Sequence, residues 1–471
     1  MKVLFINKFL SKETIYRDHL GIMSLSSAIQ PLHEVFIIEP HHDDINKTIN
    51  KIKPHVIAYS IRTGYQQYYI ALNSALKKKF KFISVFGGPH ATFFPDMIQN
   101  DGVDCVCRGE AEGAFLEFLN IIENKGDSTH IKNFWIKKDG EIYKNPPRPL
   151  VQNLDTLAFP DRRLFDNYFE IKIAKAKSFI MGRGCPFNCS YCFNEGMKEI
   201  YSGQNYIRRR SVDNVIEEIE QVMKEYNFEI AIFEDDTINL DKIWLREFTE
   251  RFRKLNIKYV CVGLRPDLVD EEVVELLKKG NCIWAVFGVE SGDERIRKEV
   301  LNRNITNEHI INCATLLKKY NIKFSTENIL AIPTCSLDDD FKTLQLNIQC
   351  SPEFCHAQLM QPYPGTKIYE IAINLGLFNK NEFDMLTDFN ERSHLLLNDK
   401  YRRENLQRLF AISVKFPFLY RIVRILIRLR LRFLYSFVYS IYRVTIGLKW
   451  LPCTRSMKEY VSLCRRYFFY K

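Results

Sequence analysis

At 471 residues the chain is too long for one ordinary hydrophobic core, and a prior of about 150 residues per domain predicts about three domains. Thirteen cysteines, with an N-terminus that reads as a buried strand and not as a signal peptide, indicate a reducing, cytoplasmic protein and exclude a disulfide-framed secreted one. The net charge of +10 belongs to one segment, because residues 405–458 hold eleven Lys or Arg and no Asp or Glu. The rest of the chain is near neutral, which argues against a nucleic-acid-binding body.

Residues 1–150 alternate short apolar runs with helical patterns such as 66–79, which predicts a doubly wound α/β domain of the Rossmann or flavodoxin type. In such sheets, ligands bind beyond the carboxyl ends of the strands. Polar residues and glycines follow several of the predicted strands, so we expect a ligand site there. The predicted strands are residues 3–7, 35–39, 56–61, 82–86 and 104–107.

Two runs at these strand ends carry a resemblance. Gly87-Gly-Pro-His-Ala-Thr92, followed by Val103-Asp-x-Val-x-Arg108-Gly-Glu-Ala-Glu112, resembles the cobalamin-binding domain that precedes many radical S-adenosylmethionine (SAM) domains. Paired glycines let a bulky ligand approach the backbone closely. The resemblance implies that Ser60, Gly87 and Gly88 line the nucleotide tail of cobalamin. The other candidate cobalamin-binding residues at these strand ends are Thr63, His90, Gly109 and Glu110.

The N-terminal domain departs from other cobalamin proteins in one motif. The Asp-x-His-x-x-Gly loop that supplies a histidine to cobalt is missing after the first strand, since Asp18 and His19 are adjacent. Many radical SAM relatives also lack that histidine, so the departure argues against histidine-ligated cobalt more than against cobalamin. Cys105 and Cys107 alternate along a strand, and free cysteine behaves as a small buried hydrophobe. We therefore interpret them as core residues and not as metal ligands.

After a predicted linker, residues 151–173, strand and helix signals alternate again over a predicted domain at 174–375. Its first strand is followed by Met181-Gly-Arg-Gly-Cys185-Pro-Phe-Asn-Cys189-Ser-Tyr-Cys192. The spacing Cys-x3-Cys-x2-Cys supplies three thiolates from one loop, as iron-sulfur clusters require. A zinc site would need a fourth ligand, and no further Cys or His lies nearby. A four-iron cluster on three cysteines leaves one iron open for a substrate or cofactor.

This loop resembles the cluster loop of the radical SAM superfamily, in which an aromatic residue, here Tyr191, precedes the third cysteine. The resemblance implies a 4Fe-4S cluster on Cys185, Cys189 and Cys192, with the amino and carboxylate groups of SAM on the open iron. It also implies reductive cleavage of SAM to methionine and a 5'-deoxyadenosyl radical that abstracts hydrogen from substrate. An external electron donor such as flavodoxin or ferredoxin is expected.

The next strands of this domain predict a partial (β/α)6 TIM-like barrel, in which catalytic groups gather at the carboxyl ends of the strands. Glu234, Asp235 and Asp236 end the second strand and are costly to bury unless paired or bound to a ligand. Capping of the next helix is the alternative interpretation. The resemblance places these carboxylates near the amino group of SAM. Arg265 ends the third strand, and its guanidinium suits a carboxylate of SAM or substrate.

The later strand ends follow the family unevenly. Phe287-Gly-Val-Glu-Ser-Gly292 resembles the family's segment near the SAM ribose, which makes Glu290 and Ser291 candidates for its hydroxyls. In Ile329-Leu-Ala-Ile-Pro-Thr-Cys-Ser336, by contrast, Ala, Thr and Cys replace two glycines and the glutamate of a Gly-Leu-Pro-Gly-Glu-Thr run. This change puts the detailed adenine contact in question. A Pro-Gly-Thr segment within residues 361–369 restores the match at the end of the barrel.

Residues 376–471 form a predicted basic helical extension. Arg421, Arg424, Arg428 and Arg432 recur at helical spacing opposite apolar residues, although 429–433 also fits strand alternation. The longest uncharged stretch, 433–442, is too short to span a bilayer. Peripheral contact of 415–450 with an anionic membrane and packing of a helix on the barrel remain equal alternatives. Nucleic-acid binding is the weaker reading and would show a steep salt dependence.

The sequence therefore predicts a cytoplasmic cobalamin-dependent radical SAM enzyme, with peripheral contact at the inner membrane surface as an option. Methyl transfer to an unactivated carbon is the simplest outcome of both cofactors, whose chemistry the protein positions and shields. The substrate would be a small molecule or a lipid-linked one. Rearrangement, cyclisation or oxidation without methylation is the enzymatic alternative. A non-catalytic cobalamin-binding module with a degenerate barrel is the alternative from another class.

Overall fold

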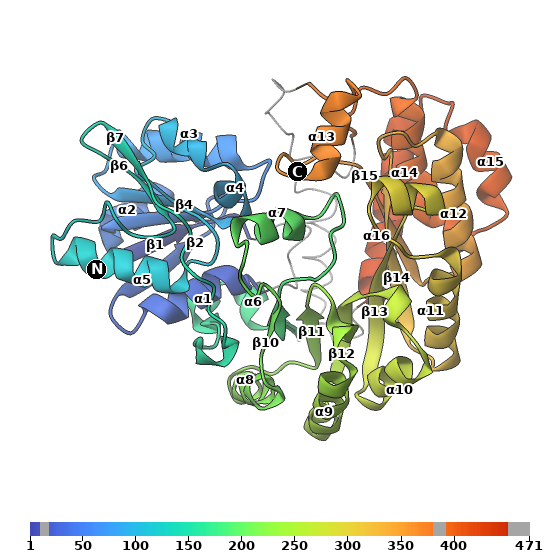
Figure 1. Ribbon diagram of the computed structural model, residues 1–471, viewed down its shortest axis with the longest axis horizontal. Helices are drawn as coiled ribbons and strands as arrows, with labels where there is room; N and C mark the ends of the chain where they lie inside the picture. Colours follow the sequence, from blue (N-terminus) through green and yellow to red (C-terminus); the bar gives the residue numbers. More distant parts are fainter. Residues whose placement is uncertain (10–17, 380–391, 451–471) are drawn as a thin grey trace. The chain divides into compact units, whose positions relative to one another are not determined.

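The computed structural model describes residues 1–9, 18–379 and 392–450, without the side chains of 444–450. The chain divides into two compact units, one of residues 1–173 and 196–206 and one of 174–195 and 207–471 (Figure 1). Parts of the predicted C-terminal extension, residues 380–391 and 451–471, lie outside the described residues.

The first unit is built on a seven-stranded sheet in the order β2-β1-β3-β4-β5-β6-β7. Strands β1 to β5 are parallel, and the hairpin β6–β7 adds to the edge in antiparallel fashion. The order 2-1-3-4-5 is that of flavodoxin-like folds, with a switch point between β1 and β3. This confirms the predicted doubly wound class, while the hairpin was not predicted. The strands are β1 Lys2–Ile6, β2 Glu34–Ile38, β3 Val56–Ser60, β4 Ile83–Gly87, β5 Cys105–Cys107, β6 Phe134–Lys138 and β7 Glu141–Lys144.

Helices cover both faces of this sheet because its parallel strands are apolar on both sides. Cys105 and Cys107 lie in the core that also holds residues of α1 and α5, whereas Val106 between them lies in the core on the opposite face with residues of α2 and α3. The interpretation of the two cysteines as buried core residues on one strand face is confirmed. The helices are α1 Leu20–Ile29, α2 Ile45–Ile52, α3 Gln66–Lys77, α4 Gly88–Phe93 and α5 Glu112–Glu123.

The segment predicted as a linker packs with the first unit. Phe165, Tyr168 and Ile171 belong to the same buried core as α1 and α5. The Ser26 hydroxyl donates a hydrogen bond to Asp161 at 2.6 Å. The segment contains only short elements, two 3-10 turns at Leu154–Thr156 and Arg162–Phe165 and the helix α6 Phe169–Lys172.

The second unit is built on six parallel strands in the order β15-β14-β13-β12-β11-β8, so each strand pairs with its predecessor in the sheet. This is the predicted partial (β/α)6 barrel, and Figure 1 shows its helices outside the sheet. A short antiparallel pair, β9 Gly182–Arg183 with β10 Arg208–Arg209, flanks the cysteine loop. The strands are β8 Ala176–Phe179, β11 Ile230–Glu234, β12 Lys258–Leu264, β13 Cys282–Glu290, β14 Lys323–Leu330 and β15 Phe354–Leu359.

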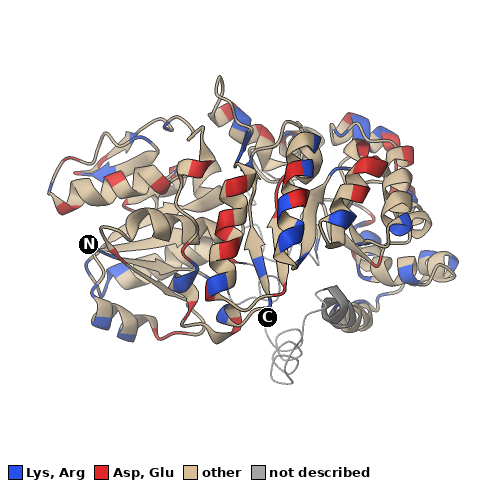
Figure 2. Cartoon of the chain, turned by 90° about the horizontal axis from the view of Figure 1, so that it is seen from below, with Lys and Arg blue, Asp and Glu red and all other residues tan. Residues whose placement is uncertain are grey.

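The helices of the barrel begin where the sequence supplies capping side chains. Ser211, Asp241 and Asp270 each accept a backbone N–H at the start of a helix, and Thr306 and Ser336 form capping boxes. Figure 2 shows both signs of charge along these helices, as expected for their solvated faces. They are α8 Val212–Glu225, α9 Lys242–Phe252, α10 Glu271–Lys279, α11 Asn307–Lys319, α12 Leu337–Cys350 and α13 Lys367–Asn374, with α7 Phe193–Ile200 after the cysteine loop.

Within the described residues 392–450, three helices follow β15 and α13: α14 Lys400–Lys415, α15 Leu419–Leu426 and α16 Arg432–Trp450. The expected amphipathic helix across 421–433 is interrupted, because a turn at 427–431 separates α15 from α16. The strand alternative for 429–433 is wrong. Asn405 of α14 donates hydrogen bonds to the carbonyls of Ile427 and Leu429, each at 3.1 Å, which fixes this turn.

Candidate cofactor sites

The cysteine loop follows β8 and is fixed by backbone hydrogen bonds from several directions. Ser190 donates from its amide to the Leu301 carbonyl and from its hydroxyl to the Val300 carbonyl. Its own carbonyl accepts the amide of Ile368, at the start of α13. The Asn302 amide donates to the Asn188 carbonyl at 2.7 Å. The loop between Cys185 and Cys192 is therefore held by residues that lie more than 100 positions away in the chain.

The three thiols differ in their surroundings. Cys189 is buried, whereas Cys185 and Cys192 are half-buried. The Cys185 sulfur lies 3.4 Å from the Thr237 hydroxyl, and the Asn194 amide donates to the Cys192 sulfur at 3.6 Å. Burial raises the pKa of Cys192 to about 11.

The three thiols and their surroundings can hold a 4Fe-4S cluster. Among the described residues, no three His, Cys, Asp or Glu side chains converge closely enough to hold one metal ion. A 4Fe-4S cluster places each cysteine on a different iron, so its thiols need not converge on a point. Arg303 supplies a second observation, because its Nε is buried and has no acceptor among the described side and main chains. A sulfide or a bound carboxylate beside the loop would satisfy that donor.

Arg303 is a candidate site residue that sequence reasoning did not single out. Its guanidinium lies 4.0 Å from the Cys189 sulfur and donates to the Gly288 carbonyl at 3.0 Å. Burial alone would lower its pKa, but Tyr191, Glu290 and Cys189 raise it above the usual range. The side chain is therefore a half-buried, permanent positive charge against the cluster loop. It follows β13 at no recognisable spacing, so no sequence pattern indicated it.

Asp235 braces the approach to the cluster loop. Its two carboxylate oxygens each lie 3.2 Å from the Met181 amide, and the Gly182 amide also contacts this carboxylate. Burial raises its pKa to about 7, opposed by these amides and by Arg209. The carboxylate thus holds the turn from β8 into the cysteine loop.

The other predicted residues of this edge lie around the loop. The Glu234 carboxylate accepts the Ser178 hydroxyl at 2.7 Å, and Asp236 is exposed near Cys192. The guanidinium of Arg265 stacks 3.2 Å from the ring centre of Phe187, inside the cysteine loop, and pairs with Asp267 at 2.8 Å. The structure therefore brings these groups to one edge of the barrel, where Arg265 already contacts Phe187 and Asp267.

The two residues predicted to bind ribose, Glu290 and Ser291, have different orientations at the end of β13. Glu290 has a φ of +63°, an uncommon conformation for glutamate, and burial raises the pKa of its carboxyl beside Tyr191 and Arg303. Its carboxylate folds over Gly288, where any Cβ would collide with it. The sequence Gly288-x-Glu290 thus makes room for this fold-back. Ser291 turns away, because its hydroxyl accepts the amide of Asp293.

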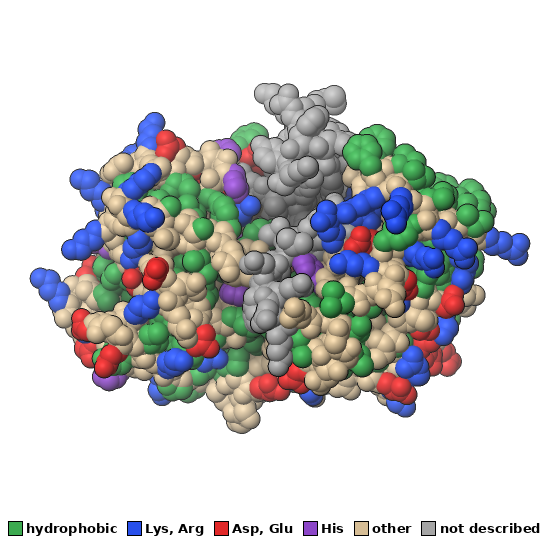
Figure 3. All heavy atoms as spheres, turned by 90° about the horizontal axis from the view of Figure 1, so that it is seen from above, with side chains coloured by type: hydrophobic (Ala, Val, Ile, Leu, Met, Phe, Trp, Pro, Cys, Tyr) green, Lys and Arg blue, Asp and Glu red, His purple; other side chains and the backbone are tan. Residues whose placement is uncertain are grey.

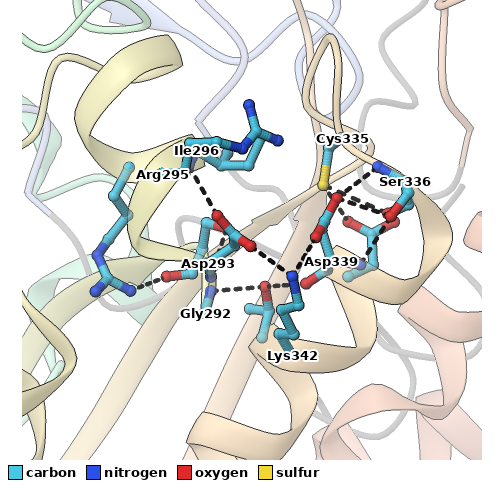
Figure 4. Close-up of polar contacts among 12 residues, drawn as sticks. Gly292, Asp293, Arg295, Ile296, Cys335, Ser336, Asp339 and Lys342 are labelled. Carbon is cyan, nitrogen blue, oxygen red and sulfur yellow. Dashed lines mark hydrogen bonds and ion pairs between the residues drawn. The ribbon is translucent and has the colours of Figure 1, made fainter.

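A polar bridge links the loops after β13 and β14 (Figure 4). Lys342 of α12 donates to Asp293 at 2.6 Å and to Asp339 at 2.8 Å. Asp339 in turn accepts the amide and hydroxyl of Ser336. These contacts tie two strand-end loops together at the carboxyl edge of the barrel.

The inner face of β14 and β15 carries a polar pair that the sequence did not single out. Phe324 on β14 and Cys355 and Ala357 on β15 pack against the helices, so Glu327 and His356 point to the opposite face of the sheet. They are direct partners in the sheet, and Glu327 lies 3.0 Å from His356 Nδ1. The side-chain Nε2 of Gln358 lies 3.2 Å from the same Nδ1. His356 Nε2 has no hydrogen-bond partner among the described residues.

In the first unit, the predicted cobalamin residues gather at the carboxyl ends of β3, β4 and β5. Gly88 has a φ of +88°, and a Cβ there would lie 2.7 Å from the Ile61 amide, so glycine is needed for the backbone itself. Asn7 at the end of β1 bonds both the amide and the carbonyl of Ser60, which fixes the switch point. Thr63 and His90 contact each other at 3.2 Å, and burial lowers the pKa of His90 to about 4.

The third of these ends carries Gly109 and Glu110. The Gly109 amide donates to the Thr92 hydroxyl at 2.9 Å, and the Glu110 amide donates to the Tyr201 hydroxyl at 3.1 Å. Hydroxyls and backbone groups at the carboxyl ends of parallel strands suit the polar nucleotide tail of cobalamin, so the donor set fits that group. Tyr201 was not predicted, since it lies beyond the cysteine loop in the chain and carries no motif.

Comparisons with known proteins agree with this architecture. Residues 179–346 match the family model of the radical SAM superfamily, and residues 18–119 match that of the B12 binding domain. An uncharacterized methyltransferase of Pyrococcus horikoshii is 29% identical over 372 residues, covering 75% of this chain and 78% of its own. An anaerobic magnesium-protoporphyrin IX monomethyl ester cyclase of Rubrivivax gelatinosus is 22% identical over 397 residues, covering 80% and 70%.

A solved structure has the same fold. The radical SAM methyltransferase TsrM from Kitasatospora setae, determined with cobalamin and a 4Fe-4S cluster bound, superimposes with a TM-score of 0.65 over 80% of this chain and 75% of its own. The sequences are 16% identical, so this likeness concerns the fold.

Fold and domain matches together define a two-domain α/β enzyme of the SAM-cleaving type. The chain belongs to the radical SAM superfamily, in the class whose radical SAM domain follows a B12-binding domain. The predicted family and the predicted cofactor set of 4Fe-4S cluster, SAM and cobalamin are confirmed at the level of these two domains. Which side chains bind the cofactors stays a prediction. Among the described residues, no helix has the length and hydropathy needed to cross a membrane.

Proposed function

We propose that this enzyme transfers a methyl group to carbon. The observation that carries the proposal is the combination, in one chain, of the braced three-cysteine loop with a B12-binding domain of flavodoxin-like topology. The methyltransferase relatives support it. Bound in these domains, the cluster would supply an electron to SAM, and cobalamin would carry the methyl group.

In this proposal, Cys185, Cys189 and Cys192 ligate the cluster. Asp235 holds the turn that enters the loop, and Arg303 keeps a positive charge beside Cys189. Glu290, held near Tyr191, faces the bound SAM. Glu327 and Gln358 orient His356 through Nδ1, so that Nε2 would form a hydrogen bond with a polar group of the substrate on the inner face of the barrel.

The test is anaerobic turnover of the reconstituted full-length protein with SAM, reductant and cobalamin. Wild type should form both 5'-deoxyadenosine and S-adenosylhomocysteine, the second of which records methyl transfer from SAM. A Cys189→Ala variant should lose the 5'-deoxyadenosine. Absence of both products from wild type, in protein that contains iron and binds SAM, would contradict the proposal.

The cyclase relative favours one second candidate, a radical cyclisation without methylation. The same assay separates the two, because a cyclase consumes SAM to 5'-deoxyadenosine without forming S-adenosylhomocysteine. Dependence of S-adenosylhomocysteine on added cobalamin is the decisive result in favour of methyl transfer.

We also propose that the C-terminal helices contact an anionic lipid surface. Phe418, Ile425 and Phe433 are 72%, 64% and 88% exposed. Arg421, Arg428 and Arg430 are exposed between them. Figure 3 shows hydrophobic and basic side chains next to each other in the part of the view where α15 lies. Exposed apolar groups beside cations fit the boundary of an anionic bilayer.

Vesicle binding tests this contact. Full-length protein should bind vesicles of phosphatidylglycerol and phosphatidylcholine, and replacement of Arg421, Arg428 and Arg430 by Gln should weaken binding about 100-fold, at about 1 kcal/mol per charge. Replacement of Lys224, Lys254 and Lys278 by Gln removes the same charge from the barrel helices and should leave binding unchanged. Equal binding by both triple variants would overturn the contact. Truncation at residue 400 is unsuitable, because α14 is part of the core.

A further inference from the structure

The loop after β14 keeps a glycine-like backbone without containing glycine. Ala331 and Thr334 have φ values of +61° and +68°, in the left-handed region that residues with a Cβ rarely adopt. These are the two positions at which the sequence departs from the Gly-Leu-Pro-Gly run. The backbone conformation is therefore retained although the residues that favour it are not, and something else must hold it.

A buried ion pair holds this loop. Asp340 of α12 accepts the Ala331 amide at 3.1 Å. Arg403 donates to Asp340 at 3.0 Å and to the Cys335 carbonyl at 2.6 Å, so it grips both ends of the turn. Arg403 and Asp340 are 3% and 1% exposed. A third bond, to Asp399 at 2.8 Å, fixes the guanidinium itself.

Arg403 comes from α14, which the sequence assigned to the basic extension. The Ala331 side chain packs in the same apolar cluster as Leu406 and Phe410 of this helix. The neighbouring Ile332 packs in another cluster, which Tyr191 of the cysteine loop also touches. The loop thus lies between the C-terminal helix and the cluster loop, and alanine in place of glycine adds a methyl that α14 covers.

We propose that Arg403 is a positioning residue for SAM. Through Asp340 and the Cys335 carbonyl, it holds residues 331–336 in the one backbone conformation in which this edge of the barrel accepts the adenosyl group. The C-terminal helix α14 is then part of the SAM site. It holds the left-handed backbone of residues 331–336, which glycines at positions 331 and 334 would adopt without such support. This inference rests on SAM binding by the barrel and not on methyl transfer.

The experiment measures SAM affinity and thermal stability on anaerobically reconstituted full-length protein. Arg403→Gln should weaken SAM binding about tenfold or more, whereas the matched change Arg402→Gln, at an exposed neighbour, should change it less than about twofold. Adding Ala331→Gly to Arg403→Gln should restore most of the affinity, because glycine adopts the left-handed backbone unaided. It should not restore the Tm, because it removes a buried methyl.

Restored SAM affinity without a restored Tm would distinguish a positioning role of Arg403 from a general effect on stability. If Arg403→Gln binds SAM as wild type does, or if Ala331→Gly restores nothing, the proposal is overturned. Should Arg403→Gln fail to fold, hydrogen exchange on the wild type decides: SAM should slow exchange of the amides in 329–336, and absence of that protection counts against the proposal. Wild type that binds no SAM would contradict the proposed function as well, whereas SAM binding without methyl transfer would contradict that function alone.

Discussion

The cluster loop and the loop after β14 lie at carboxyl ends of strands in the same barrel, yet different means hold them. The cluster loop is bonded by backbone and side chains of the neighbouring strand ends, such as Leu301 and Asp235. The loop after β14 is held by Arg403, which lies 68 positions beyond Cys335 in the chain. The first device belongs to the barrel, whereas the second belongs to the helix that follows it.

This difference separates two halves of the basic C-terminal segment as well. Helix α14 buries Leu406, Phe410 and the charged Arg403. Helix α15, which is also basic, exposes Ile422 and Ile425 and buries Val423. A run of arginines and apolar residues therefore does not by itself distinguish a structural helix from a surface one.

The largest effect is expected from the cysteines themselves. Cys189→Ala should abolish the iron content and visible absorption of the reconstituted protein, because a three-ligand cluster that loses one cysteine has two open irons. Cys335→Ala removes a buried thiol from the loop after β14 and should leave the iron content unchanged. Iron and sulfide analysis measures both. A cluster retained in Cys189→Ala would contradict the assignment of iron binding to the cysteine loop and not to the loop after β14.

The two halves of the basic segment should differ next in stability. Phe410→Ala empties a fully buried position in α14 and should lower the free energy of unfolding by about 3–5 kcal/mol. Ile425→Ala on α15, where the side chain is 64% exposed, should stay within about 0.5 kcal/mol of wild type. Urea unfolding followed by circular dichroism gives both values. Equal losses would show that α15 is buried in solution.

Sequence reasoning predicted the two sheets and the cysteine loop, because both signals are local. Parallel strands buried on both faces appear as apolar runs, and the cysteine spacing can be recognised from the sequence alone. It did not reveal Arg303, Arg403 or the pair of Glu327 and His356, since each acts through neighbours brought together only by the fold. Ser291 was predicted from a recognised sequence run, yet its hydroxyl accepts a hydrogen bond from the nearby Asp293 amide. A recognised run therefore does not ensure that each of its side chains faces a ligand.

The loop after β14 shows the same limit in another form. Replacement of glycine by Ala331 and Thr334 indicated a changed contact, and the backbone angles show that the glycine-like conformation is kept. No pattern could reveal this, because the compensating charge lies in a segment whose composition indicated a surface helix. The interruption at 427–431 was equally hidden, since α14 fixes that turn through Asn405.

On the cluster side, Asp235 should make stability depend on pH. Burial raises its folded-state pKa to about 7, above the ordinary value of about 3.9, so the folded state keeps a proton that the unfolded state releases between these values. Stability therefore falls as pH rises through this window. From about pH 5 to about pH 7, wild type should lose about 1 kcal/mol per pH unit relative to Asp235→Asn. The exposed neighbour Asp236→Asn is the control and should follow wild type; parallel curves for wild type and Asp235→Asn would contradict the assignment.

The smallest effect should appear in the cluster's reduction potential, to which Arg303 and Arg403 should contribute differently. Reduction adds an electron to the cluster, so a positive charge at Arg303, 4.0 Å from the Cys189 sulfur, stabilises the reduced form. Arg303→Gln should therefore lower the midpoint potential by tens of millivolts, and Arg303→Lys should recover much of it. Arg403→Gln should leave the potential where it is, because the hydrogen bonds of Arg403 go to Asp340, Asp399 and the Cys335 carbonyl and not to the cluster loop. Redox titration followed by electron paramagnetic resonance measures all three variants. If Arg403→Gln shifts the midpoint potential as much as Arg303→Gln does, the loop after β14 affects the cluster directly. That result would contradict the distinction between residues that act on the cluster and residues that position SAM.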